Sequence, residues 1–418
     1  MAQLSDDCFA FGGPLMSMTE ALALLAARTA PVVGTETVGL RRAGGRILAA
    51  DVLATGDVPP VDNAAVDGYA VRHADLDPAT PTRLPVTGRA AAGHALGRAA
   101  GPGEAIRIFT GAAMPAGCDT VAMQEDCTVD GDHVIVAPGL AHGANRRRAG
   151  EDIRAGATVL AAGRRLRPQD IGLAAAVGAA DLVVYQRLRT AVFSTGDELR
   201  DPGDTPPAGC IYDSNRYGLM AMLEGLGCAV DDLGILPDRL EAIGDALAAA
   251  AAGHHLIATS GGMSVGEEDH VKAAVEAGGS LYFWRLAIKP GRPLGLGRIG
   301  GVPFVGLPGN PVAMMVTFMR VARPVILRLG GCTELEPHLF RVPADFAHRK
   351  KTGRREWVRA RLAADGDGRL VARKFGRDGA GILSSMVEAD GLVELPEDLA
   401  RLEPGTLVDF LPFDEVSH

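Results

Sequence analysis

From Arg189 to Gly330 the sequence alternates between short apolar runs and helix-forming segments, and this alternation restricts the fold more than any other feature. It predicts a doubly wound α/β domain, a parallel sheet with helices on both faces, because parallel strands need a crossover connection. The expected strands are 190–193, 228–235 and 255–259, and the expected helices are 215–226, 239–252, 269–277 and 311–329. Ligands of such domains gather at the carboxyl ends of the strands, so we expect a site in the loops after Phe193 and Thr259.

Further segments flank the α/β region. A capping-box sequence from Ser17 to Glu20 predicts an N-terminal helix, and a second helical segment follows Pro168. Between them, short apolar runs broken by Gly, Pro and Asp predict a β-rich insert, so the two helical segments are expected to form one split domain. The tail has the pattern of a small β-barrel or sandwich. The predicted domains of this α/β multidomain chain are 14–58 with 148–188 (split helical linker), 59–147 (β-rich insert), 189–331 (α/β) and 332–418 (C-terminal, β-barrel-like).

The charge balance limits the kind of ligand. The chain of 418 residues has 42 Lys and Arg against 51 Asp and Glu, a net charge of −9. This disfavours binding to nucleic acid or to an anionic membrane, because phosphate contacts need clustered cations.

The longest apolar run, 246–252, is far shorter than the ~20 residues that span a bilayer. The six cysteines lie far apart without metal-type spacing, so we expect a reduced, cytoplasmic protein with a small-molecule ligand.

Acidic residues recur in short glycine-bracketed loops. Any one of these loops could be an ordinary surface turn, because Gly and Asp dominate turns for local reasons. Together they suggest a single site, since converging carboxylates suit a hard cation and glycine lets a backbone come close to a ligand. The candidate acids are Asp67, Asp152, Glu198 and Asp269.

Two segments of the α/β region are suited to anions. In 307–311 a strand ends and a helix opens, with Asn310 at the N-cap and Pro311 at the first helical position. Free backbone N–H groups at such a start attract phosphate. The segment 260–264 offers a second set of amides and hydroxyls. Positive charge is available from Arg285, Lys289 and Arg292.

Three motifs have competing interpretations. Gly295, Gly297 and Gly300 satisfy GxGxxG, but a strand follows them where a dinucleotide site needs a helix, so a β-turn is the better interpretation. Ser264 lies in a GxSxG sequence after a strand, as in a serine hydrolase, although the downstream His residues lie outside the α/β region. Covalent labelling of Ser264 by serine-directed inhibitors would favour that interpretation. The arginine run 146–148 is either a solvated turn or an anion contact.

At these segments the chain resembles the molybdopterin molybdenumtransferases, the MoeA family and the E domain of gephyrin. The similar stretches are 62–71 (DNAAVDGYAV), 109–112 (FTGA), 147–152 (RRAGED), 193–199 (FSTGDEL), 212–215 (YDSN), 259–266 (TSGGMSVG), 287–293 (AIKPGRP) and 307–311 (LPGNP). They occur in order from about residue 16 to 412. Mild departures are Val66 in place of Met, Met263 in place of Val, and Arg285 and Arg292 where Lys is frequent.

The resemblance implies an α/β domain of the molybdopterin-binding type and a homodimer whose cleft is formed by both subunits. The implied reaction inserts molybdenum from molybdate into the dithiolene of adenylylated molybdopterin and releases AMP, with Mg²⁺ as cofactor. Asp67, Asp152, Glu198 and Asp269 would be catalytic, and Glu198 and Asp269 would bind the metal. The implied substrate-binding residues are Thr110, Arg148, Thr195, Ser260, Gly261, Gly262, Ser264, Arg285, Lys289, Arg292, Pro308, Asn310 and Pro311.

Other functions related to this family stay open at the level of sequence. A non-catalytic scaffold is one, because the E domain of gephyrin also binds receptor peptides. A tungsten-selective or a molybdopterin-adenylylating relative is another, although the split and tail domains argue against the adenylyltransferase. Tungstate and molybdate are nearly equal in size and charge, so the sequence does not distinguish them. Other enzymes of cofactor synthesis are candidate partners.

Overall fold

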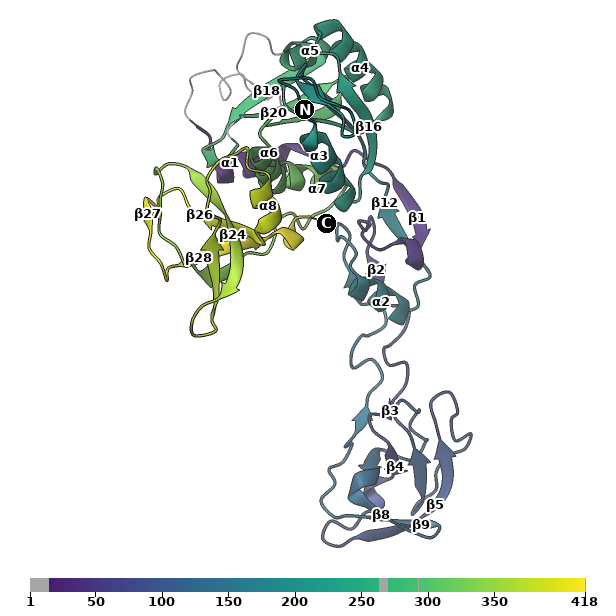
Figure 1. Cartoon of the computed structure of the whole chain (residues 1–418). Coiled ribbons are helices and arrows are strands. Elements are labelled where there is room, and N and C mark those ends of the chain that lie inside the picture. Colours follow the sequence, from purple (N-terminus) through teal and green to yellow (C-terminus); the bar gives the residue numbers. More distant parts are fainter. Residues whose placement is uncertain (1–14, 263–269, 292, 418) are drawn as a thin grey trace.

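The computed structural model describes residues 15–262, 270–291 and 293–417. The molecule is elongated (Figure 1). An α/β lobe and a C-terminal β lobe lie together at one end, and an insert lobe of strands lies at the other. A narrow stem around α2 (Pro168–Ala176) connects the two ends.

The α/β lobe is built on a six-stranded sheet of order β16-β13-β17-β21-β20-β18. Its strands are β13 (Arg189–Thr195), β16 (Ala229–Leu236), β17 (Leu256–Ser260), β18 (Gly279–Arg285), β20 (Pro293–Ile299) and β21 (Val302–Leu307). The first four strands of that order are parallel, as predicted. The sheet also has an antiparallel edge that the sequence did not predict, where β20 pairs antiparallel with both β21 and β18. A tight turn, and no helix, joins β20 to β21, so the chain reverses there.

Helices cover both faces of this sheet because successive strand residues point to opposite sides. Ala191 and Phe193 pack under α4 (Leu240–Gly253) and α5 (His270–Gly278), whereas Val192 faces the opposite core. That second core contains α3 (Ser214–Gly225), α6 (Pro311–Thr317) and α7 (Arg323–Leu329). A five-residue π-helical turn, Phe318–Ala322, joins α6 to α7, so the predicted helix 311–329 is continuous but locally widened.

The GxGxxG glycines belong to the hairpin at the edge of the sheet. Gly295 and Gly297 lie inside β20, and the chain turns at Gly300 and Gly301, both with positive φ. The interpretation of this motif as a β-turn is therefore confirmed, and no phosphate-binding helix follows it.

The insert lobe contains a six-stranded sheet of order β7-β4-β6-β5-β9-β8. The strands are β4 (Gly68–Val71), β5 (Thr82–Ala90), β6 (Ala105–Ile108), β7 (Thr120–Met123), β8 (Cys127–Asp130) and β9 (His133–Val136). Gly68, the first residue of β4, lies so close to β7 that an added Cβ would be 1.9 Å from the carbonyl oxygen of Ala122. Only glycine fits there, and this fixes the position of the preceding Asp67.

The stem is made by the chain entering and leaving the insert. Strands β1 (Thr35–Gly39) and β2 (Val52–Leu53) pair with β12 (Asp181–Tyr185) and β11 (Thr158–Leu160), respectively. Nearer the insert, β3 (Asn63–Ala64) pairs with β10 (Arg146–Arg147). Helix α1 (Met18–Arg28) begins with the predicted capping box, and its residues Met18 and Ala21 belong to the core shared with α3 and α7.

The C-terminal lobe has a sheet of order β19-β24-β26-β28-β22. Its strands are β22 (Phe340–Pro343), β24 (Arg355–Ala364), β26 (Gly391–Leu395), β28 (Leu407–Pro412) and the edge strand β19 (Ile288–Lys289), with β25 (Leu370–Lys374) paired to β24. The short β23 (His348–Arg349) pairs with β27 (Arg401–Leu402), and α8 (Ser384–Glu388) follows β25. Strand β19 comes from the α/β segment, so this segment contributes an edge strand to the sheet of the C-terminal lobe. In the part of the chain that the structure describes, no helix is long and apolar enough to cross a membrane.

Candidate active site

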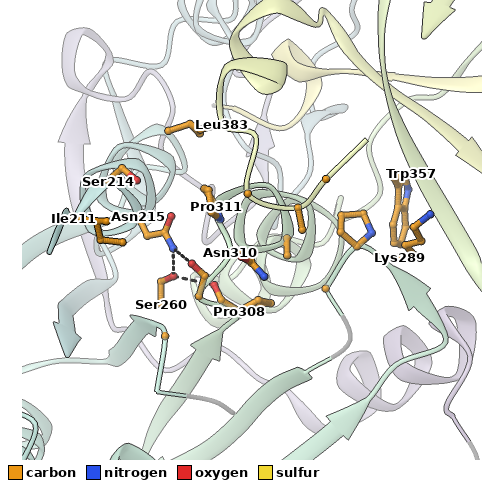
Figure 2. A pocket seen from close by; sticks show the side chains of 18 of the residues that line it. Ile211, Ser214, Asn215, Ser260, Lys289, Pro308, Asn310, Pro311, Trp357 and Leu383 are labelled. Atoms are coloured by element: carbon orange, nitrogen blue, oxygen red, sulfur yellow. Dashed lines mark hydrogen bonds between the residues drawn. The ribbon is translucent and has the colours of Figure 1, made fainter. Parts of the chain in front are cut away.

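A cavity of about 1120 Å³ lies between the α/β lobe and the C-terminal lobe. The ends of β13, β17 and β21 and the starts of α3 and α6 form one wall (Figure 2). The opposite wall comes from β24 and from residues 378–383. This is the carboxyl edge of the parallel strands, where the alternating sequence predicted a ligand site.

Hydrogen bonds fix the loop after β17 to the start of α6. The Asn215 Nδ2 donates to Ser260 Oγ at 2.9 Å and to the carbonyl of Gly309 at 2.7 Å (Figure 2). The Ser260 hydroxyl in turn donates to the carbonyl of Pro308 at 3.0 Å. Gly261 and Gly262 follow with φ of 96° and 62°, a conformation that favours glycine. The predicted residues Ser260, Gly261 and Gly262 thus line one hydrogen-bonded wall of the cavity.

The start of α6 differs in two details from the sequence expectation. Asn310 occupies the N-cap and Pro311 the first helical position, as predicted, but the Asn310 side chain makes no capping hydrogen bond. The amide of Val312 is not free, because it donates to the carbonyl of Ala380 at 3.0 Å. A carbonyl of the C-terminal lobe therefore binds one of the backbone N–H groups that the sequence predicted to be free for an anion. Pro308, Asn310 and Pro311 still line the cavity.

Glu198 and Thr195 lie in the cavity wall after β13. The Glu198 carboxylate folds back over Gly196, where an added Cβ would come within 2.6 Å of Glu198 Oε2. Glycine at 196 therefore makes room for this acid. The hydroxyl of Thr195 donates to Asp238 Oδ1 at 3.2 Å. Asp238 was absent from the predicted site, although it follows the end of β16 and so occupies the same edge of the sheet.

The insert lobe holds Asp67 and Thr110 together. The Asp67 Oδ1 accepts from the amide of Thr110 at 2.8 Å and from its hydroxyl at 2.7 Å. Both hydrogen bonds lower the pKa of Asp67 below its ordinary value, and the bond from the amide has the larger effect. The carboxylate is therefore ionised at neutral pH.

Asp152 and Arg148 lie between β10 and β11 and are exposed. The amide of Arg148 donates to Glu151 Oε2 at 2.8 Å. Within one chain neither Asp67 nor Asp152 lines the cavity. For Asp67 the reason is the position of the adjacent β4, which lies at the opposite end of the molecule from α3 and α6 (Figure 1). Ser264, Asp269 and Arg292 lie outside the described residues, and so does the side chain of Arg285.

The C-terminal lobe contributes charged residues that the sequence had not assigned to the site. Arg354, Glu356, Arg359 and Asp378 all line the cavity. Lys289, which was predicted, reaches Glu356 Oε1 with its Nζ at 2.7 Å. Local patterns did not predict this pairing, because these residues lie in a separate segment of the chain from the α/β motifs. Among residues 15–262, 270–291 and 293–417, no three His, Cys, Asp or Glu side chains are grouped so that they could hold a metal ion.

The fold and site define a multidomain α/β protein with a charged cavity at the strand ends, and comparisons agree with this class. Family models match 16–178 (MoeA N-terminal region, domain I and II), 191–328 ("probable molybdopterin binding domain") and 341–413 (MoeA C-terminal region, domain IV). The molybdopterin molybdenumtransferase of Haemophilus influenzae is 38% identical over 91% of this chain and 95% of its own length. Molybdopterin molybdenumtransferase 2 of Mycobacterium tuberculosis is 37% identical over 88% of this chain and 93% of its own.

Solved structures agree as well. The molybdopterin biosynthesis moeA protein of Pyrococcus horikoshii OT3 superposes with a TM-score of 0.80 at 30% identity, covering 95% of this chain and 100% of that one. The chain belongs to the MoeA family of molybdopterin molybdenumtransferases. The family resemblance and the α/β multidomain fold inferred from the sequence are thereby confirmed.

Proposed function

We propose that this protein is a molybdenumtransferase of molybdenum cofactor synthesis that inserts molybdenum from molybdate into adenylylated molybdopterin and releases AMP. The observation that carries the proposal is the cavity of about 1120 Å³ with Lys289, Arg354 and Arg359 in its wall. Its size suits a nucleotide-linked pterin, and its cations suit phosphate and molybdate. Catalysis would depend on positioning and on stabilisation of developing charge, with no protein nucleophile.

Mg²⁺ is the cofactor that fits this donor set. Magnesium is usually held by one or two carboxylates together with substrate phosphates, so a closed cage of protein ligands is not needed. Glu198 supplies a carboxylate in the cavity wall, and Asp269, outside the described residues, is the proposed second ligand. When bound, the ion would offset the charge of the phosphates.

The complete site is proposed to form in a homodimer. Asp67, Thr110, Arg148 and Asp152 do not line the cavity of their own chain, so in this arrangement they would face the cavity of a second subunit. The proposed domains are those predicted from the sequence, 14–58 with 148–188, 59–147, 189–331 and 332–418.

The direct test incubates the pure protein with adenylylated molybdopterin, Mg²⁺ and molybdate. AMP release and molybdenum cofactor formation are measured in the same samples, and further arms omit Mg²⁺ or replace molybdate by tungstate. We expect both products to appear together and only with the divalent ion. Absence of AMP in the complete mixture would refute the proposal, and equal rates in EDTA would remove Mg²⁺ from it.

A further inference from the structure

Glu356 is a buried carboxylate at the border of the two lobes. Its residue is 2% exposed, and it lies near the start of β24. Strands β19 and β24 pair in parallel with Lys289 directly opposite Glu356, so the two side chains are neighbours on one face. A charge buried to this extent is rarely kept without a partner, so its contacts indicate what it does.

His348 is the second partner of Glu356. Its Nε2 lies 3.0 Å from the same Oε1 that accepts from Lys289. Its Nδ1 faces the Nζ of Lys374 at 3.4 Å. An ammonium group can only donate, so Nδ1 accepts and Nε2 carries the proton that His348 donates to Glu356. His348 thus adds a second hydrogen bond to the Oε1 atom that accepts from Lys289. The Nη2 of Arg354 lies farther away, 3.5 Å from Glu356 Oε2, so Lys289 has the closer cationic side chain of the two.

The contacts continue behind the cavity wall. Lys374 also pairs with Asp378 at 3.0 Å, and Asp378 itself lines the cavity. A connected array therefore starts and ends at the cavity surface and runs through Asp378, Lys374, His348, Glu356 and Lys289. All its members except Lys289 belong to the C-terminal lobe, so this lobe sets the position of the lysine.

The array keeps Glu356 charged and Lys289 ordered. Burial alone would raise the pKa of Glu356, but the hydrogen bonds from Lys289 and His348 outweigh burial and lower that pKa below its ordinary value. The side chain of Lys289 is 49% exposed, and a lysine stem is flexible, so ordering it costs conformational entropy. An ion pair formed before the ligand arrives removes that cost from binding.

We infer that Glu356, supported by His348, is a positioning residue that holds the Lys289 ammonium ready for the anionic part of the ligand. This inference rests on the proposed function and deepens it. By charge alone, Glu356 opposes an anion, so neutralising it would tighten anion binding if it had no positioning role. Neutralising Glu356 should therefore weaken anion binding if the residue positions Lys289, and tighten it if the residue acts only through its charge. Binding measurements distinguish these two roles.

The first test measures the state of Lys289 without any substrate. The full-length protein is treated briefly with an amine-acetylating reagent, and acetylation of Lys289 is quantified by mass spectrometry. We expect Glu356→Gln to raise the acetylation rate about fivefold or more, and His348→Gln to raise it less. Glu394→Gln is the matched control, because Glu394 is also buried, in β26, but bonds to Arg355, Trp357 and Arg320.

The second test titrates the same proteins with inorganic molybdate by calorimetry. We expect Glu356→Gln to weaken molybdate binding about tenfold, Glu394→Gln to leave it unchanged, and Glu356→Gln to have no added effect in a Lys289→Met background. Unchanged acetylation, tighter or equal molybdate binding in Glu356→Gln, or equal losses in Glu356→Gln and Glu394→Gln would overturn the inference. A wild-type protein that binds no molybdate would instead count against the proposed function, and the acetylation rates would still decide whether Glu356 holds Lys289.

Discussion

The Asp67 carboxylate shows how one residue gains a defined charge state from its surroundings. Both hydrogen bonds to its Oδ1 come from Thr110, which is 43 positions later in the sequence. Because they favour the ionised form, they keep the pKa of Asp67 below its usual value. An acid prepared in this way suits a partner that carries positive charge, such as a metal ion.

Thr110→Ala should move the pKa of Asp67 part of the way back toward its ordinary value. The substitution removes the hydroxyl donor and keeps the amide donor, which has the larger effect. Carbon-13 NMR titration of the Asp67 carboxyl measures the change. Thr110→Ser keeps the hydroxyl and serves as control, so identical titrations of the Ala and Ser variants would contradict this account.

Glu198→Gln should lose at least about a hundredfold in molybdenum insertion, because an amide is a poor ligand for the proposed Mg²⁺. The fold should persist, since Glu198 is exposed. Cofactor formation and AMP release are the measurements, with circular dichroism as the check on folding. Asp197→Asn, a change at the exposed neighbouring acid, should keep nearly full activity. Equal activity of the Glu198 variant and the wild type would exclude Glu198 from the reaction.

Among the elements, helix α2 of the stem is stabilised at its N-terminus by one acidic residue, Asp170. The Asp170 Oδ2 accepts from the amide of Arg167, the N-cap residue, at 2.9 Å, and Arg164 Nε lies 3.1 Å from Oδ1. Although burial opposes the charge, the hydrogen bonds from Arg167 and Arg164 lower the pKa of Asp170 to about 2. The folded state therefore favours the ionised acid.

Asp170→Asn should lower the free energy of unfolding by about 2 kcal/mol at pH 7. A lowered pKa in the folded state means that the stabilisation is complete above about pH 4 and is lost as the pH falls toward 2. The difference in free energy of unfolding between variant and wild type should therefore be smaller at pH 3 than at pH 7. Guanidinium unfolding at both pH values tests this, with the exposed Asp181→Asn as control. A difference that is equal at both pH values would contradict the electrostatic origin.

At the scale of the whole molecule, the elongated shape separates the predicted acids. The insert lobe with Asp67 and the cavity with Lys289 lie at opposite ends of one chain (Figure 1). A site built from both ends needs two copies of the chain, each giving its insert lobe to the cavity of the other.

Mixed dimers test this arrangement. Asp67→Asn and Lys289→Met subunits should each be inactive alone, whereas a mixture that is unfolded and refolded together should recover up to about a quarter of wild-type activity. In a mixed dimer one cavity has both wild-type residues and the other has neither, and random pairing makes half of the dimers mixed. Activity that stays at the level of the separate variants would show that each site is made within one chain.

Much of the fold was predictable from local sequence patterns. The capping box at Ser17, the alternation after Arg189 and the turn at Gly300 each fix a structure within a few residues, because capping, periodicity and backbone freedom act over short distances. The α/β segments that line the cavity were likewise predicted, since the ends of parallel strands meet at one edge, whereas the lining residues of the C-terminal lobe were not. The antiparallel edge of β18 and β20 was missed because a hairpin and a crossover can join similar apolar runs.

The sequence by itself determined the types of element, the family and the α/β segments that line the cavity. Tertiary structure decided which charges meet: it placed Glu356 beside Lys289, Asp238 beside Thr195 and the carbonyl of Ala380 on the helix start. It also placed β4, which directly follows Asp67, at the opposite end of the molecule from the cavity-lining α3 and α6. Such contacts join residues that are distant in sequence, and they form only because packing of separate cores makes the free energy of that arrangement lowest.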